Sequence, residues 1–335
     1  MIGIRRSAYL VAIWLMFQCC VASAAEPATA AIGGFEVKFV EVNGIKTRYY
    51  DQGSGDPLLL VHGGPWEGTS SANDWSRNIE GLSKEFRVLA PDKLGNGVTG
   101  NPDRAAEADF TMAGQIKHLA RFIETMDVGP VNIVAHAEGD ISLFLAVERP
   151  DLVKSLVLFS SNIAAPDVGE DSRKEALAEC PWEVYGQEIG PWMDELICRY
   201  ESLSYDNSHL DDEFILALQT MNLDPKVQWT RFYRDGGAGA PFVANIDNWR
   251  DAMHARIRDN GELEIPVLLI WARNDPTHPL ERSMALYDIL AEHNPSVQTL
   301  MINHAGHYAF REKPDEFNFA IIRFIRAWRA LGEID

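Results

Sequence analysis

The sequence predicts an α/β fold in which a mostly parallel, doubly wound sheet carries an inserted helical cap. Three observations support this class. Short apolar runs of strand length alternate with longer stretches of helical periodicity. A buried strand, a tight turn and an apolar helix follow one another in PVNIVAHAEGDISLFLAVERP at residues 130–150. From about 163 to 259 no clear buried strand occurs, and aromatic residues and helical patterns replace it.

The elements of the core can be assigned in chain order. The first two strands alternate polar and apolar residues and are joined by Asn43-Gly44, a pair that favours a hairpin turn. Thr111 is a suitable N-cap for the second helix. The expected strands are 35–42, 45–51, 58–61, 87–90, 131–135, 152–159, 266–271 and 297–302. The expected helices outside the inserted segment are 75–85, 112–126, 141–147, 280–291 and 314–331.

The composition limits the kinds of partner. Hydrophobic residues make up 46% of the 335 residues, enough for a sizeable core, and the formal net charge is −19. Such a charge argues against nucleic acid and anionic membranes, which attract basic surfaces. The chain holds no CxxC pair and no HExxH motif, so we predict no metal and no cofactor. The expected partner is a small molecule.

The first 24 residues have the features of a signal peptide. Arg5 and Arg6 form a positive start, residues 8–20 are mostly apolar, and Ala-Ser-Ala at 22–24 matches a cleavage site. We therefore expect a periplasmic or secreted protein with no stable membrane anchor after cleavage. The alternative is an uncleaved anchor, for which the apolar run is short.

Only two cysteines, Cys180 and Cys198, remain after the expected cleavage site. An even number of cysteines in an oxidising compartment is compatible with a disulfide that closes one local loop. Two free cysteines in the core are an equally good interpretation of the sequence.

The turn of the strand–turn–helix segment reads AHAEG at 135–139. A nucleophile elbow usually reads G-x-S-x-G, with small flanking residues because backbone packs closely on backbone in the strained turn. The flanking residues Ala135 and Gly139 are small as expected, but Ala137 stands at the nucleophile position. A methyl group cannot attack a carbonyl carbon, so we do not predict serine-type acyl transfer.

Four further motifs lie at the ends of predicted strands. They are HGGP at 62–65, APDKLGNG at 90–97, WARNDPTHPLER at 271–282 and HAGHYAFREKP at 304–314. With them, the chain resembles α/β-hydrolase-fold proteins with a helical cap from residue 35 to its end, and it is similar to the meta-cleavage-product (carbon–carbon bond) hydrolases. Haloperoxidases, epoxide hydrolases and esterases share most of these signatures. The resemblance implies a core of residues 25–162 and 260–335 and a cap at 163–259.

The resemblance also implies an acid–base pair. The triad acid is expected at Asp275, after the strand 266–271, and the triad base at His307, after the strand 297–302. His304 is a nearby competitor for the second role. The order of elbow, acid and base along the chain fits this fold. In such a pair the carboxylate fixes the imidazole tautomer and stabilises its charged form.

An oxyanion hole is expected from the backbone N–H groups of Gly64 and Glu138. The expected substrate contacts are Gly63, Pro65, Trp66 and His136. The side chains of Glu138 and Asp140 would oppose a developing negative charge beside this hole unless they point away or are neutralised.

These residues support four functional hypotheses. In the first, the Asp275–His307 dyad and the oxyanion hole act on a small, partly apolar carbonyl or ester compound without a covalent nucleophile. In the second, the protein is a pseudoenzyme that binds a small ligand under its cap. In the third, Ala137 is an engineered replacement of serine. In the fourth, the nucleophile is Ser142 or Glu138, although both lie away from the apex of the elbow. We favour the first hypothesis.

Overall fold

The computed structural model describes residues 30–64, 70–102, 111–169, 173–176, 180, 189–227, 230 and 246–332. The predicted signal peptide and the predicted substrate contacts Pro65 and Trp66 lie outside these described residues. Among the described residues, no helix combines the length and the hydropathy needed to cross a membrane.

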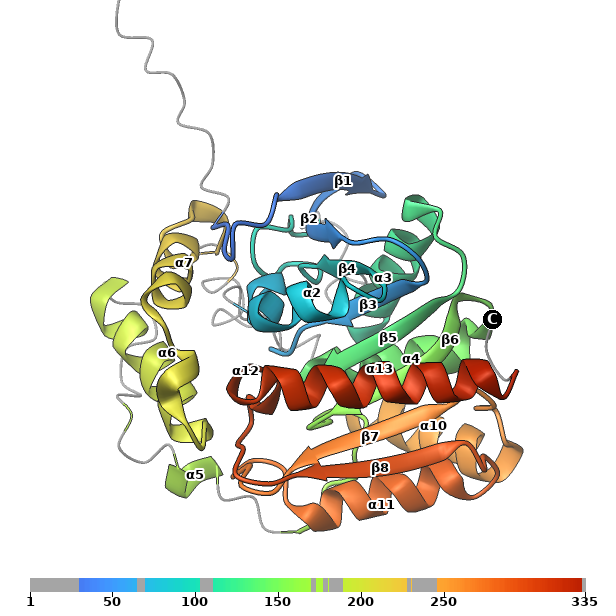
Figure 1. Cartoon of the computed structure of the whole chain (residues 1–335). Coiled ribbons are helices and arrows are strands. Elements are labelled where there is room, and N and C mark those ends of the chain that lie inside the picture. Colours follow the sequence, from blue (N-terminus) through green and yellow to red (C-terminus); the bar gives the residue numbers. More distant parts are fainter. Residues whose placement is uncertain are drawn as a thin grey trace, which may run out of the picture.

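An eight-stranded sheet forms the centre of the molecule (Figure 1). Its strands are β1 (Lys38–Val42), β2 (Ile45–Gln52), β3 (Pro57–Val61), β4 (Arg87–Pro91), β5 (Val131–His136), β6 (Val153–Phe159), β7 (Val267–Ala272) and β8 (Val297–Ile302). Their order is β1-β2-β4-β3-β5-β6-β7-β8. The hairpin β1–β2 is antiparallel and joins β4 antiparallel, whereas the pairs from β4 to β8 are parallel. The predicted mostly parallel sheet with an antiparallel leading hairpin is confirmed.

Helices cover both faces of the sheet because successive side chains of each strand point to opposite faces. On one face, strand residues such as Leu59 and Ile133 pack in one apolar cluster with α3 (Met112–Met126), α4 (Ile141–Glu148), α10 (Ile246–Asn260) and α11 (Leu280–Ala291). On the other, Leu58 and Val134 join a second cluster with α2 (Ser76–Leu82), α12 (Ala309–Glu312) and α13 (Pro314–Ala330). The predicted N-cap is also confirmed, since the Thr111 side chain accepts from the Gly114 N–H.

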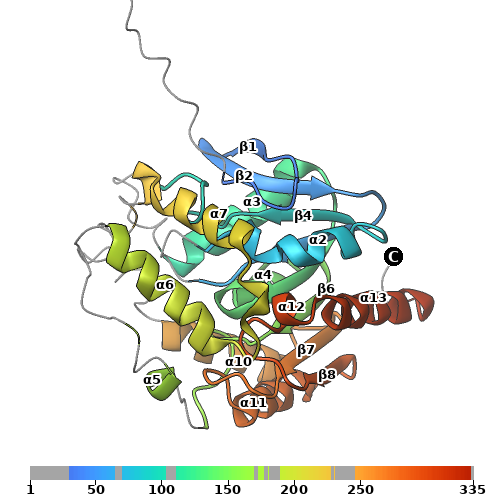
Figure 2. The same cartoon turned by 60° about the vertical axis from the view of Figure 1, so that its left-hand side comes forward.

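The inserted segment between β6 and β7 contains α5 (Arg173–Ala176), α6 (Ile189–Leu203) and α7 (Asp212–Asn222) before α10. Figures 1 and 2 show α6 and α7, which we call the cap helices, packed together beside the ends of the parallel strands. By contrast, α10 packs against α4 and α11 of the core. The cap boundaries at 163 and 259 therefore stay predictions, although α10, which falls within that range, packs on the core.

A disulfide joins Cys180 to Cys198 of α6. Of the two alternatives that the sequence leaves open for these cysteines, the structure holds the paired one. The bond ties the chain before α6 to the helix itself, next to the residues of α6 that reach the candidate site.

Candidate active site

The elbow between β5 and α4 keeps the geometry of a strained turn although it carries no nucleophile. Ala137 has φ +46°, a left-handed conformation that costs a non-glycine residue about 1–2 kcal/mol. Gly139 follows where a Cβ atom would lie 2.5 Å from the carbonyl oxygen of Val61, so only glycine fits between the elbow and β3. The chain therefore retains the backbone that elsewhere presents a nucleophile, but presents a buried methyl group.

The predicted acid and base are brought together at the carboxyl ends of β7 and β8. The two strands are parallel neighbours, so the loops that follow them meet at one edge of the sheet. Nδ1 of His307 lies 2.9 Å from Oδ2 of Asp275. The competitor His304 packs against the ring of Tyr205, 5.5 Å away between ring centres.

Asp275 is held as an ionised carboxylate. It accepts hydrogen bonds from the Ser160 hydroxyl at 2.8 Å and from the Thr277 N–H and hydroxyl at 2.8 and 2.7 Å. Burial alone would raise the pKa of Asp275, but His307, His278 and the hydrogen bonds hold that pKa well below its usual range. An ionised Asp275 requires the proton of neutral His307 on Nδ1, which leaves the lone pair of Nε2 for chemistry.

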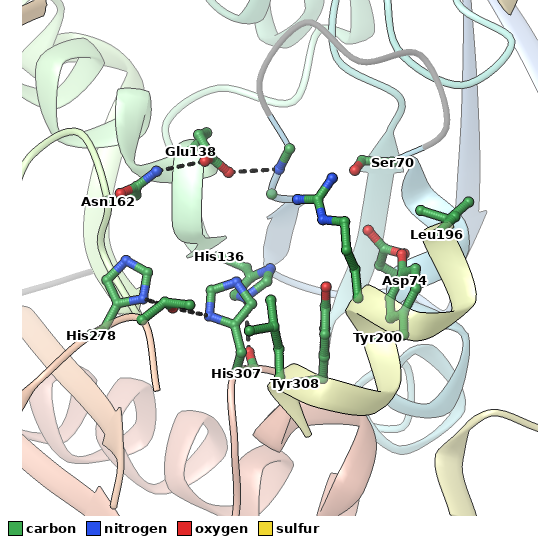
Figure 3. Close-up of a pocket in the computed structure, with 15 residues that line it drawn as sticks. Ser70, Asp74, His136, Glu138, Asn162, Leu196, Tyr200, His278, His307 and Tyr308 are labelled. Atoms are coloured by element: carbon green, nitrogen blue, oxygen red, sulfur yellow. Dashed lines mark hydrogen bonds between the residues drawn. The ribbon is translucent and has the colours of Figure 1, made fainter. Parts of the chain in front are cut away.

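A second imidazole, not singled out from the sequence, shares this carboxylate. The His278 ring is stacked on the His307 ring, with 5.2 Å between centroids and 12° between planes (Figure 3). Its Nδ1 lies 3.4 Å from Oδ2 of Asp275 and 2.5 Å from the Thr277 hydroxyl. Burial lowers the pKa of His278, so this imidazole is neutral near pH 7. The only sequence signal was a histidine three residues after the expected acid.

Glu138 occupies the predicted oxyanion hole with its own side chain (Figure 3). The Gly64 N–H donates to Oε2 of Glu138 at 2.7 Å, and the Asn162 amide donates to Oε1 at 2.6 Å. Burial alone would raise the pKa of Glu138, but the Lys93 cation and the backbone N–H of Glu138 itself lower it. The two N–H groups expected to stabilise an oxyanion thus already face an anion. This carboxylate does not point away, and its charge is stabilised by the donors of the hole and by the Lys93 cation.

Asp140, in contrast to Glu138, is held in its neutral, protonated form. It is fully buried and accepts the Ala164 N–H at 2.6 Å through Oδ2. Burial raises the pKa of Asp140 from 3.8 to about 8, with the Glu138 charge contributing in the same direction. At neutral pH most molecules carry this carboxyl group in its protonated form, and Glu138 is the anion of the elbow.

The remaining predicted contacts form the floor of the site. His136 is buried, and its Nε2 lies 3.0 Å from the carbonyl oxygen of His307, which fixes the loop of the base. Burial holds the pKa of His136 well below its usual range. Gly63 is required by close packing, since a Cβ atom there would lie 2.8 Å from Nδ1 of His136.

These groups surround a cavity of about 60 Å³. Its wall is formed by the loop after β3, the elbow, the loops after β6, β7 and β8, and helix α6, which contributes Leu196, Arg199 and Tyr200. His307, His278 and Glu138 all line it. The arrangement can bind a small ligand and exchange a proton with it through His307, but it offers no hydroxyl group for covalent catalysis at the elbow.

Comparisons with known proteins agree with this architecture. A family model described as "alpha/beta hydrolase fold" matches residues 56–314. A 2-hydroxy-6-oxo-6-(2'-aminophenyl)hexa-2,4-dienoic acid hydrolase of Metapseudomonas resinovorans is 28% identical over 86% of this chain and 90% of its own length. A 2-hydroxymuconate semialdehyde hydrolase of Pseudomonas sp. (strain CF600) is 26% identical over 82% of this chain and 88% of its own.

Solved structures give the same result. A serine hydrolase involved in carbazole degradation superposes with a TM-score of 0.66 at 25% identity, covering 88% of this chain and 99% of its own. A meta-cleavage product hydrolase, solved as a point mutant, gives a TM-score of 0.66 at 25% identity over 87% and 98%. The similarity to meta-cleavage-product hydrolases expected from the motifs is confirmed.

Proposed function

Because the chain belongs to the alpha/beta hydrolase fold family, we propose that it is an enzyme of hydrolase type that acts on a small, partly apolar carbonyl or ester compound. The observation that carries this proposal is the 2.9 Å contact between His307 and Asp275, with His307 lining a cavity. Curated relatives named as hydrolases of dienoic acid and semialdehyde compounds support the substrate class.

The proposed mechanism uses the dyad as a general base. Nε2 of His307 takes a proton from a bound water or from an acidic O–H or C–H group of the substrate. Asp275 stabilises the imidazolium that results, as its ionised state and hydrogen bonds allow. The proton returns from Nε2 to the product. No acyl-enzyme forms, because Ala137 has no group that could carry the acyl chain.

Glu138 determines how far the oxyanion hole can contribute. A carbonyl oxygen that gains negative charge can reach the Gly64 N–H only after the Glu138 carboxylate has left it. Leaving also breaks the bond from Asn162. In the described conformation the hole therefore gives no help to a developing oxyanion, and the proposed hydrolysis depends on proton transfer by the dyad or on movement of the Glu138 carboxylate.

Hydrolysis of p-nitrophenyl acetate by the mature protein tests the proposal. We expect slow turnover that falls about 100-fold or more in His307→Gln, the usual size of a general-base contribution. His304→Gln is the matched control and should leave the rate unchanged. If His307→Gln keeps the parental rate, the dyad has no role in turnover and the proposal fails.

Two further variants test the roles of Ala137 and Glu138. Ala137→Ser alone should remain slow, because Glu138 still fills the hole. Ala137→Ser combined with Glu138→Met should exceed that single variant by about 100-fold, comparable to the effect of an oxyanion donor. A single variant as fast as the double variant would show that Glu138 does not block the hole.

A ligand-binding pseudoenzyme is the second candidate, and the occupied hole is the observation that favours it. A pure binder would show no turnover that depends on His307. It would still bind ligands in the cavity, so the same variants separate the two functions.

We also propose that the protein is exported to the periplasm or secreted. The disulfide between Cys180 and Cys198 supports this, because disulfides persist in oxidising compartments. The mass of the mature protein should correspond to cleavage after Ala24. A full-length mass in the soluble fraction would contradict the proposal.

A further inference from the structure

His278 has an atom for which the protein provides no partner. Its side chain is only 2% exposed, and among the described residues no group hydrogen-bonds to its Nε2 atom. A buried polar atom without a partner is unfavourable, and such atoms in native proteins are few. The same residue lines the cavity beside His307. A bound ligand is therefore the natural source of the missing partner.

The hydrogen bonds of Thr277 determine what Nε2 can do. The Thr277 hydroxyl has a single proton and donates it to Oδ1 of Asp275 at 2.7 Å. At its 2.5 Å contact with Nδ1 of His278, the hydroxyl oxygen must then accept. His278 therefore carries its proton on Nδ1, and Nε2 presents a lone pair. The missing partner must be a hydrogen-bond donor.

A purely structural role does not require this atom. The carbonyl oxygen of His278 accepts from the Trp271 indole at 2.6 Å, and its ring packs edge-on against Trp271. The first contact uses the backbone, and an apolar ring would make the second equally well. The polar contacts that use the imidazole, with the Thr277 hydroxyl and with Oδ2 of Asp275, are both made by Nδ1, so they leave Nε2 without a function.

The rest of the cavity favours the same kind of ligand group. The Glu138 carboxylate lines this cavity, and Nε2 of His307 presents a second lone pair there. Three acceptors thus lie on one side of a space of about 60 Å³, whose walls also include Arg199, the Asn162 amide and the aromatic side chains of Tyr200 and Tyr308. A hydroxyl group on a small unsaturated or aromatic ligand provides donors for these acceptors and a flat surface for the walls.

We propose that His278 is a specificity-determining residue whose Nε2 accepts a hydrogen bond from a hydroxyl group of the substrate, while His307 acts as the base. This inference rests on the proposed function for the identity of the base. Hydroxyl recognition by His278 itself can be measured without turnover.

The test uses phenol and its methyl ether anisole as probes, which differ only in the hydroxyl proton and a methyl group. Calorimetry measures the dissociation constant of each for the mature protein and two variants. His278→Gln keeps a hydrogen-bond acceptor near the position of Nε2, whereas His278→Met has similar bulk without a comparable acceptor. In ¹⁵N-labelled protein, the Nε2 resonance of His278 reports directly on an accepted hydrogen bond.

The parent should bind phenol about 10-fold or more tightly than anisole, as expected for a buried acceptor that loses its donor. His278→Met should lose this preference, His278→Gln should retain most of it, and phenol should shift the Nε2 resonance in the parent. Equal binding of both probes by the parent, or an unchanged phenol preference in His278→Met, would overturn the inference. Ester turnover that does not depend on His307 would instead refute the proposed function, so the two failures are distinguishable.

Discussion

At the scale of single residues, the elbow has a methyl group at the nucleophile position and a carboxylate directly beside it. Ala137 keeps the left-handed backbone of the turn, and the next residue, Glu138, places its carboxylate against the Gly64 N–H. Two residues further on, Asp140 is buried with a pKa of about 8. Three of four successive positions thus differ in charge or polarity from a serine elbow, while the backbone keeps the strained turn.

The raised pKa of Asp140 makes the free energy of unfolding depend on pH, and the direction of the shift determines the sign of that dependence. Between about pH 4 and pH 8 the folded chain holds a proton that the unfolded chain, with a pKa near 3.8, has lost. The free energy of unfolding therefore falls as the pH rises through this window, by up to about 1.4 kcal/mol per pH unit for one group. We expect Asp140→Asn to flatten this slope in urea denaturation at pH 5, 6, 7 and 8. If the free energy of unfolding changes with pH equally in variant and parent, Asp140 is not the group responsible for the slope.

At the scale of elements, the loop after β7 and helix α6 supply site side chains that the core strands do not: the loop provides the acid, and the helix provides part of the cavity wall. The loop supplies Asp275, Thr277 and His278 within four positions, so one turn determines the charge of the acid and the tautomers of both imidazoles. Helix α6 closes the cavity with Tyr200 and is fixed through Cys198 by the disulfide.

Removal of the disulfide should destabilise the protein. Replacing Cys180 and Cys198 together by serine should lower the free energy of unfolding by about 3 kcal/mol, the usual value for a loop of this length. Guanidinium denaturation measures the difference. The parent treated with reductant is the control and should match the variant. A variant as stable as the untreated parent would mean that the bond does not constrain the unfolded chain.

At the scale of the whole molecule, one buried cation connects the cap helices to the core. The guanidinium of Arg311, on α12, is fully buried and lies 3.6 Å from the ring of Phe214 on α7. It donates at 3.0 Å to the carbonyl oxygens of Asp74 and His209 and to the hydroxyl of Ser76. The segments before α2, before α7 and after β8 therefore meet at a single side chain.

Replacing this side chain should affect the entire fold. Arg311→Met leaves several buried acceptors without a donor, so we expect the free energy of unfolding to fall by about 3 kcal/mol. Arg326→Met is the control: Arg326 pairs with Glu85 on the surface and should cost less than about 1 kcal/mol. Thermal and urea denaturation measure both. Equal effects of the two variants would show that Arg311 does not connect cap and core.

The sequence was sufficient for the sheet and for the pairing of Asp275 with His307, because both depend on strand order and on where parallel strands end. It was insufficient for Glu138, because the orientation of that side chain depends on hydrogen-bond donors at Gly64 and Asn162, which are distant in the chain. The role of His278 could not be predicted from the sequence for a similar reason. It depends on stacking against His307 and on an Nε2 atom without a partner among the described residues.

The elbow also determines how this protein can be detected. Reagents that survey hydrolases in whole cells, such as fluorophosphonates, form a covalent bond to an activated serine hydroxyl. The left-handed turn of this chain presents the methyl group of Ala137 at that position, with a carboxylate filling the adjacent hole. Such a reagent finds no hydroxyl group to modify at the nucleophile position. A census of hydrolases based on serine labelling would therefore overlook this protein even while it was turning over its substrate.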